Sequence, residues 1–165
     1  MGMLKLFSNR RSSSEQVDSK RGNEILNEGI LFEDRDEFLK WGSSIRKLSN
    51  TIRNKKISGD RTVYYWGKHT VLNGLELDLT TMFWRYRIES LFKKFNHIEF
   101  WAIGDKEAEN YLELIRGHIE NQFGNPTKEE TENREVSLEW EINNVKISLY
   151  FFEQHVYKLH LKISN

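Results

Sequence analysis

The fold of this chain follows from one stretch of sequence, Val71-Leu72-Asn73-Gly74-Leu75-Glu76-Leu77-Asp78-Leu79. Its second part alternates leucines with Glu76 and Asp78, and this alternation is typical of a strand with one buried and one solvated face. Asn73-Gly74 separates that run from the apolar residues before it. Asn and Gly tolerate the positive φ that a tight hairpin turn needs, so the stretch predicts an antiparallel β-hairpin.

A second stretch repeats this pattern, Ile142-Asn143-Asn144-Val145-Lys146-Ile147-Ser148-Leu149. Asn143-Asn144 takes the place of the first turn, and apolar residues again alternate with polar ones after it. A tryptophan precedes each turn by an odd number of residues, Trp66 before the first and Trp140 before the second. This spacing places both tryptophans on the same face of their hairpins. We therefore expect two equivalent hairpins.

A helical pattern precedes each hairpin. The first helix is expected to begin at Ser43 or Ser44, which are good N-cap residues, with apolar side chains on one face as far as Ile52. The second is predicted over residues 105–123, where apolar side chains follow helical spacing and Asp105 can cap the start. Gly124-Asn125-Pro126 ends this helix.

Together these elements predict an α+β fold, a tandem αβββ repeat in which helices pack on one face of an antiparallel sheet. The halves are placed at about 38–103 and 104–164. Residues 97–103 are apolar on both faces, as in a central strand. The polar residues 1–24 are expected to form a mobile tail, because they offer almost no apolar surface to bury, and residues 25–165 to form a single domain.

Two short motifs accompany this order of elements, Phe38-Leu39-Lys40-Trp41-Gly42-Ser43-Ser44-Ile45 and Phe123-Gly124-Asn125-Pro126. Over about residues 38–164 the chain resembles the tandem-repeat architecture of the β-lactamase inhibitor proteins. It also resembles small uncharacterised bacterial proteins, some of which are toxin-immunity proteins. The resemblance rests on the order of elements, and it assigns no functional residue.

The composition excludes several kinds of chemistry. The 165 residues include no cysteine, so disulfides, a thiolate nucleophile and cysteine-ligated metals are excluded. The sequence shows no motif of a serine nucleophile or of a phosphate-binding loop, and its five histidines lack the spacing of a metal site. We therefore name no catalytic, cofactor-binding or metal-ligating residue and expect no cofactor. Whether the protein is an enzyme stays open, and a non-enzyme is favoured.

Charge is balanced overall but not along the chain. Basic and acidic residues number 25 each. Residues 35–62, however, carry eight basic and three acidic side chains, whereas residues 104–145 carry four basic and eleven acidic ones. The folded surface is therefore expected to be bipolar.

The ends and the composition also indicate a location. Arg10-Arg11 follows closely on the N-terminal residues 1–7, which leaves no apolar segment long enough for a secretory signal. No apolar run reaches the roughly 18 residues of a membrane-spanning helix. We expect a cytoplasmic protein without a membrane partner. The single proline and fourteen asparagines suggest an AT-rich bacterial source.

Aromatic and basic side chains mark the candidate binding residues. Residues 83–87 interleave the two kinds, and three polar residues of the last strand share its solvated face. Such side chains anchor protein interfaces, and they also bind nucleic acid; packing of the aromatics in the core is the favoured interpretation. The candidate partner-binding residues are Trp84, Arg85, Tyr86, Arg87, Trp101, Lys158, His160 and Lys162.

The leading hypothesis is a non-catalytic bacterial protein-binding module, an immunity or inhibitor protein, whose partner is another protein. The alternative is a nucleic-acid-associated module that uses the basic residues of 35–62 and 85–94. A small hydrolase is the third hypothesis. The sequence indicates no oligomeric state.

Overall fold

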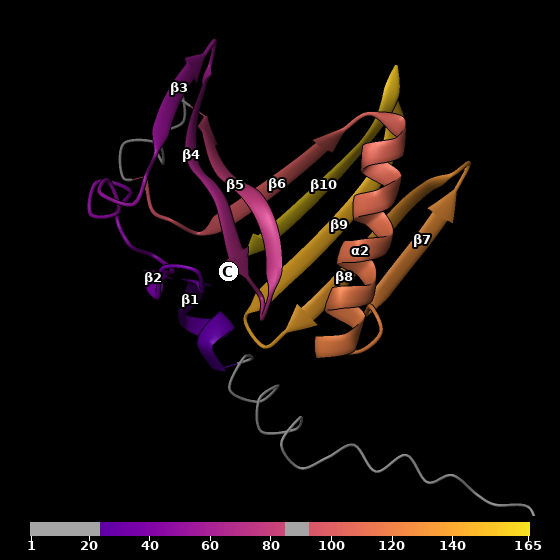
Figure 1. Ribbon diagram of the computed structural model, residues 1–165, viewed down its shortest axis with the longest axis horizontal. Helices are drawn as coiled ribbons and strands as arrows, with labels where there is room; N and C mark the ends of the chain where they lie inside the picture. The colour runs from indigo at the N-terminus through magenta and orange to yellow at the C-terminus, as the bar shows by residue number, and fades with distance from the viewer. Residues whose placement is uncertain (1–23, 85–92) are drawn as a thin grey trace, which may run out of the picture.

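A computed structural model describes residues 24–84 and 93–165, and this part of the chain is mostly β-structure (Figure 1). A short helical segment covers residues 24–28. The elements that follow are β1 Gly29–Phe32, β2 Glu37–Lys40, β3 Asn54–Ser58, β4 Arg61–Val71, β5 Leu75–Trp84, β6 His97–Ile103, α2 Asp105–Phe123, β7 Lys128–Glu132, β8 Glu135–Ile142, β9 Val145–Gln154 and β10 Val156–Ser164.

Strands β3 to β10 form one antiparallel sheet, eight-stranded in the described residues, in the order β3-β4-β5-β6-β10-β9-β8-β7. Two meanders, β3 to β6 and β7 to β10, therefore meet through their last strands. β6 pairs with β10 along its whole length, from His97 opposite Ser164 to Ile103 opposite Lys158. Between β5 and β6, by contrast, the described pairing is limited to Thr80 opposite Glu99. The contact between β6 and β10 thus joins the two meanders.

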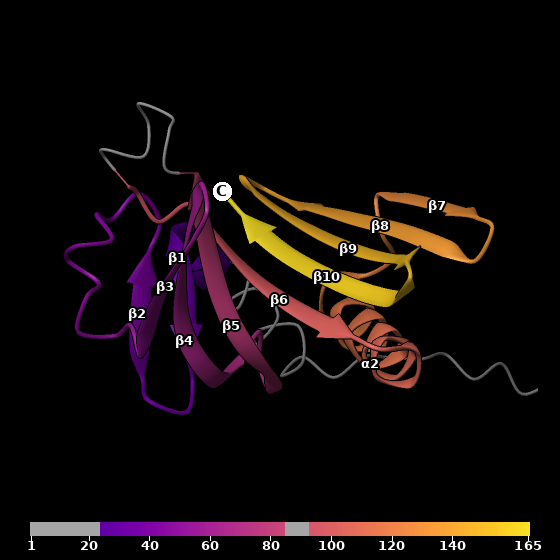
Figure 2. The ribbon, with the colours of Figure 1, turned by 90° about the horizontal axis from the view of Figure 1, so that it is seen from above.

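One face of the sheet is covered and buried. α2 lies against β6, β9 and β10, and β1 lies against β4 (Figure 2). The helix contributes Ala108, Ile115 and Ile119 to the core. The strands beneath it contribute the buried residues Ile98, Phe100, Ala102, Leu138, Trp140, Ile147, Leu149, Leu159, Leu161 and Ile163. On the opposite face of β6 to β10, none of the described elements covers the sheet.

The β1–β2 hairpin is held on β4 by aromatic and polar contacts. His69 is almost fully buried, and its ring stacks on Phe32 with 4.2 Å between centroids. Its Nδ1 lies 3.0 Å from Oδ2 of Asp34, whose other carboxylate oxygen accepts a hydrogen bond from the backbone N–H of Thr70. Because these groups come from the hairpin and from β4, they fix the hairpin to the sheet.

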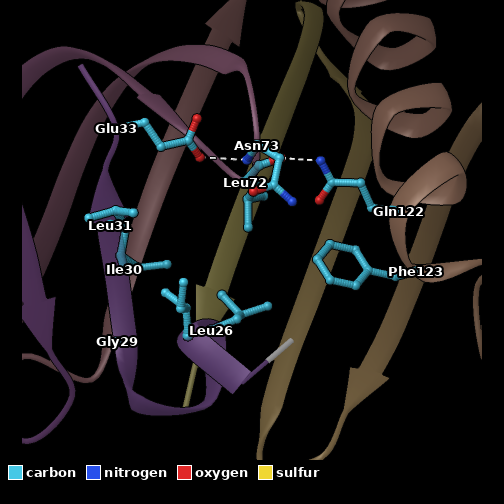
Figure 3. Close-up of a pocket in the computed structure, with 10 residues that line it drawn as sticks. Leu26, Gly29, Ile30, Leu31, Glu33, Leu72, Asn73, Gln122 and Phe123 are labelled. Carbon is cyan, nitrogen blue, oxygen red and sulfur yellow. Dashed lines mark hydrogen bonds between the residues drawn. The ribbon is translucent and has the colours of Figure 1, made fainter. Parts of the chain in front are cut away.

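Three distant segments meet at a small cavity (Figure 3). The backbone N–H of Asn73 donates to Oε1 of Glu33 at 2.5 Å. The carbonyl oxygen of Leu72 accepts a hydrogen bond from the side-chain amide of Gln122 and lies 2.6 Å from Nε2 of His118. The cavity has a volume of about 40 Å³, room for only a few water molecules. This junction is a structural contact between the β4–β5 turn and α2, too small for a ligand.

The predicted α+β fold, a tandem αβββ repeat with helices on one face, is wrong. Residues 45–51 form turns instead of the expected first helix. Ile45 and Leu48 are buried as a helical stripe would be, but backbone hydrogen bonds to neighbouring chain hold this segment: the N–H of Ile45 donates to the carbonyl of Lys93, and that of Arg53 to the carbonyl of Tyr65. The local bonds within the segment join residues mostly three apart, such as the N–H of Thr51 to the carbonyl of Leu48, which is typical of turns and not of a regular α-helix.

Other expectations differ in their outcome. The strand at 97–103 and the helix at 105–123 are confirmed. Asn143-Asn144 is a two-residue turn as predicted, whereas the first turn has three residues, 72–74. Asp105 does not cap its helix and instead accepts a hydrogen bond from a backbone N–H of β10.

The polar segment between α2 and residue 135 contains a strand. Residues 128–132 form β7, and the turn at Asn133-Arg134, where both residues have positive φ, connects it to β8. Of the expected tail, residues 1–24, all but Glu24 lie outside the described residues, and Glu24 begins the short helical segment. None of the helices in the described parts of the chain is long and apolar enough to span a membrane.

The last strand provides a test of the buried face. Leu161, fully buried beneath α2, should lose about 2 to 5 kcal/mol of unfolding free energy when changed to alanine, because a cavity replaces packed side chain. Lys106→Ala on the exposed side of α2 should cost less than about 0.5 kcal/mol. Chemical denaturation measures both; equal costs would show that the strand presents the wrong face to the core.

Candidate functional site

The uncovered face of the second half of the sheet carries a row of side chains across five strands. Trp101 on β6 lies opposite His160 on β10, and His160 lies opposite Tyr150 on β9. Tyr150 is followed by Ser137 on β8 and Glu130 on β7. Residues directly opposite each other in antiparallel strands point to the same face. The register alone therefore brings these five residues into one line.

A groove of about 410 Å³ follows this row. We call it the acidic groove, because three carboxylates line it together with several aromatic residues. These residues are Glu130, Glu132, Glu135, Trp101, Tyr150, Phe151, Phe152 and His160. Its volume falls within the range of small-molecule sites and could also hold a long side chain of a partner.

Aromatic stacking forms one end of the acidic groove. The rings of Trp101 and His160 are nearly parallel, with 3.9 Å between centroids and an interplanar angle of 11°. Tyr150 lies on the other side of His160, 6.3 Å from its ring centroid. Trp101 nevertheless leaves 41% of its surface exposed. Its ring is thus held in place while one side remains available for contact.

A buried carboxylate lies beneath the stack. Glu99 is only 5% exposed, and its Oε2 accepts a hydrogen bond from Nε1 of Trp101 at 3.3 Å. Nε2 of His97 lies 3.6 Å from Oε1, and Nε2 of His160 lies 3.7 Å from Oε2. These last two distances exceed those of ordinary hydrogen bonds. Glu99 therefore fixes the orientation of Trp101.

Burial and neighbours shift the pKa values of this cluster. Burial by itself would raise the pKa of Glu99, but the interactions with His160, His97 and Trp101 outweigh it and hold that pKa below its usual 4.5. Burial lowers the pKa of His97 below its usual 6.5, although Glu99 acts in the opposite direction. At neutral pH Glu99 is therefore charged and His97 neutral.

The helix on the other face orients the acidic wall of the groove. The guanidinium of Arg116 on α2 donates to both carboxylate oxygens of Glu129 on β7, at 3.1 and 3.2 Å. Side chains alternate along a strand, so Glu129 faces α2 while Glu130 and Glu132 face the groove. This contact keeps the edge strand, which carries no apolar side chain, in a defined orientation.

The chemistry of this arrangement suits recognition of a cation. Carboxylates attract a positive charge, and the face of a tryptophan or tyrosine ring adds a cation–π contribution. Within residues 24–84 and 93–165, no three His, Asp or Glu side chains are arranged to hold a metal ion. Carboxylates beside aromatic rings are also the groups that bind an arginine or lysine side chain.

The partner-binding residues predicted from the sequence lie in different parts of the structure. Trp101, Lys158, His160 and Lys162 share the uncovered face of β6 and β10, although the last three are half-buried, not freely solvated. Trp84 ends β5, where the guanidinium of Arg61 lies 4.3 Å from its ring centroid.

From the pairing of Thr80 with Glu99, Trp84 lies about six residues, or roughly 20 Å, from Trp101 along the strands. Trp84 is therefore not part of the acidic groove. The remaining predicted residues, Arg85, Tyr86 and Arg87, lie outside the described residues.

Sequence reasoning missed Glu99 and the three carboxylates of the acidic groove. A signal for Glu99 was present, because it is the one acidic residue in the otherwise apolar and aromatic run 97–103. Glu130, Glu132 and Glu135 gave no such signal, since a strand without apolar residues has no hydrophobic period.

Comparison of the chain with protein-family models, curated proteins and solved structures found no match. Function must therefore be inferred from the groove and its charges.

The buried histidine predicts a pH dependence of stability. Burial lowers the pKa of folded His97 below the usual 6.5, so the unfolded state binds this proton at a higher pH than the folded state does. The unfolding free energy therefore falls as the pH decreases below about 6.5. The slope from this group is at most about 1.4 kcal/mol per pH unit. His97→Gln should flatten the profile between about pH 7.5 and 5.5, measured by urea unfolding.

His155→Asn, at an exposed turn with positive φ that asparagine tolerates, serves as the control. A His97→Gln profile as steep as that of the unchanged protein would contradict the assignment of a neutral buried His97.

Proposed function

We propose that the protein is a non-catalytic protein-binding module whose acidic groove holds a basic side chain of its partner. One observation carries this proposal. Glu132 and Glu135 lie directly opposite each other across β7 and β8, and no cation within the described residues pairs with either. Glu130, in contrast, pairs with Lys128 at 2.9 Å.

Two carboxylates at directly opposite positions repel each other and destabilise the strand pair. A cation placed between them would relieve this repulsion. The repulsion between these carboxylates costs little free energy at an exposed site, but it favours any ligand that brings a positive charge. A basic side chain of a partner is the simplest such ligand.

The surroundings of the acidic groove suit a protein more than a free cation. Trp101, Ile103 and Val156, all on the uncovered face, are three of the seven large hydrophobic side chains that are exposed in the described parts of the chain. Aromatic rings and an apolar rim around charged groups are features of protein interfaces. An arginine of the partner can stack on Trp101 and bind the carboxylates at once.

The narrower hypotheses remain predictions. An immunity or inhibitor role would require the partner to be a toxin or an enzyme that the protein neutralises. The bacterial source, the cytoplasmic location and the resemblance to β-lactamase inhibitor proteins likewise await a test.

A pair of short peptides tests the groove. In two-dimensional ¹H–¹⁵N spectra, Gly-Arg-Gly-Arg-Gly amide should shift the indole N–H signal of Trp101, whereas the matching glutamate peptide should not. We expect a dissociation constant on the order of millimolar, because only a few exposed contacts form.

Two double variants distinguish binding in the acidic groove from a general effect of negative charge. Glu132→Gln/Glu135→Gln should weaken binding of the arginine peptide at least about fivefold, since both unpaired carboxylates are removed. Glu107→Gln/Glu109→Gln removes the same charge from the exposed first turns of α2 and should leave binding of the arginine peptide unchanged. Equal weakening by both variants, or no shift at Trp101, would overturn the proposal.

A further inference from the structure

A second groove of about 1000 Å³ is lined by residues of β2, the turns after it, β3, β4 and positions 93–94. Figure 1 shows these strands on the opposite side of the molecule from β7 and β8. None of the described residues that line it is acidic. We call it the basic groove, after the six cations in its lining: Lys40, Arg46, Lys47, Lys55, Lys93 and Lys94.

Backbone contacts give the basic groove a defined shape. The N–H of Gly42 donates to the carbonyl of Phe95 at 2.7 Å, and the N–H of Phe95 donates to the carbonyl of Ser43 at 2.7 Å. The rings of Trp41 and Phe95 stack with 4.9 Å between centroids. Two chain segments that carry cations are thereby held side by side.

A tyrosine forms part of the floor. Tyr64 is 8% exposed, and the ammonium groups of Lys55 and Lys93 lie 5.8 and 5.5 Å from its ring centroid. Nζ of Lys93 also donates to the hydroxyl of Tyr64 at 3.3 Å. These contacts hold two positive charges from different segments at one place in the basic groove.

The six cations have no counter-charge in the described protein. None of them forms an ion pair with a described carboxylate, whereas Lys68, Arg116 and Lys146 elsewhere each pair with glutamate. Cations gathered in a concave surface without anions repel one another, and they focus a positive potential there. Such a groove is suited to an anionic ligand.

We propose that the basic groove binds the phosphate backbone of single-stranded nucleic acid. A single phosphate group carries too little charge to neutralise six cations, whereas a strand brings one charge with each nucleotide. Trp41 and Tyr64 are too buried to stack on bases, so contact with the backbone, independent of base sequence, is expected.

The concave shape of the basic groove favours a single strand over other polyanions. A duplex is bound mainly by elements that enter its grooves, and a membrane presents a flat surface. The basic groove shares no lining residue with the acidic groove, so either site can exist without the other.

Fluorescence anisotropy with a labelled oligothymidylate of about 20 nucleotides tests this proposal. If all six cations contact phosphates, affinity should fall roughly 300-fold between about 50 and 200 mM salt. In Arg46→Gln/Lys47→Gln, which replaces two exposed cations, the fall should be only roughly 50-fold. Binding at the lower salt concentration should also be weaker than for the unchanged protein.

The control Lys68→Gln/Lys106→Gln removes two exposed cations outside the basic groove and should bind like the unchanged protein. Equal loss in both double variants, or no binding at low salt, would overturn the proposal. Tighter binding to a duplex of the same length, or to vesicles with about 30% phosphatidylserine, would also overturn it. Unchanged oligothymidylate binding by Glu132→Gln/Glu135→Gln is expected and separates this proposal from that of the acidic groove.

Discussion

The pairing of β6 with β10 is the constraint on which the rest of the structure depends. It joins the two meanders along the whole of β6, whereas the described pairing of β6 with β5 inside the first meander is limited to one position. It also decides which side chains face α2 and which remain uncovered, because a shift of one residue would exchange the two faces of each strand. The buried residues Leu159, Leu161 and Ile163 and the uncovered row that starts at Trp101 are therefore two results of one register.

The same pairing explains why a charged residue can lie in the middle of the sheet. Glu99 would be costly to bury alone, but the neighbouring strand brings His160 to it, and β6 itself supplies His97 and Trp101. The carboxylate in turn holds the indole of Trp101 by its N–H. The pairing of β6 with β10 therefore also orients the exposed ring of Trp101 on the face that carries the carboxylates of β7 and β8. The charge asymmetry of the sequence is also present in the structure. The basic groove is lined from β2, β3 and β4 and the acidic groove from β6 to β10, and Figure 1 shows these two sets of strands at opposite ends of the molecule.

The sequence predicted the elements whose signals are local. α2 was predicted to the residue, since nineteen residues keep a helical period and Gly124 ends them. The turn segment 45–51 was mistaken for a helix because its apolar spacing fits one. Its local hydrogen bonds join residues mostly three apart, as in turns, and the N–H of Ile45 donates to the distant carbonyl of Lys93. β7 was missed because its orientation depends on Arg116 of the helix, a contact that no pattern within Lys128–Glu132 reveals. Trp101 was named for its place among aromatic and basic side chains, and His160 for its place on the polar face of the last strand. The order of the strands, which brings these two residues together, could not be read from local periodicity.

A disulfide engineered across β6 and β10 tests the central register most directly. The chain has no cysteine, so Ile103→Cys/Lys158→Cys introduces one possible pair at directly opposite positions. Opposite residues in antiparallel strands are about 4.5 to 5.5 Å apart at Cα, which suits a disulfide. Mass spectrometry after mild oxidation should show an intramolecular disulfide in this variant and not in Ile103→Cys/Tyr157→Cys, whose second cysteine points to the other face. Failure of the first variant to form the bond, or equally efficient formation in the second, would contradict the register and with it the assignment of both faces.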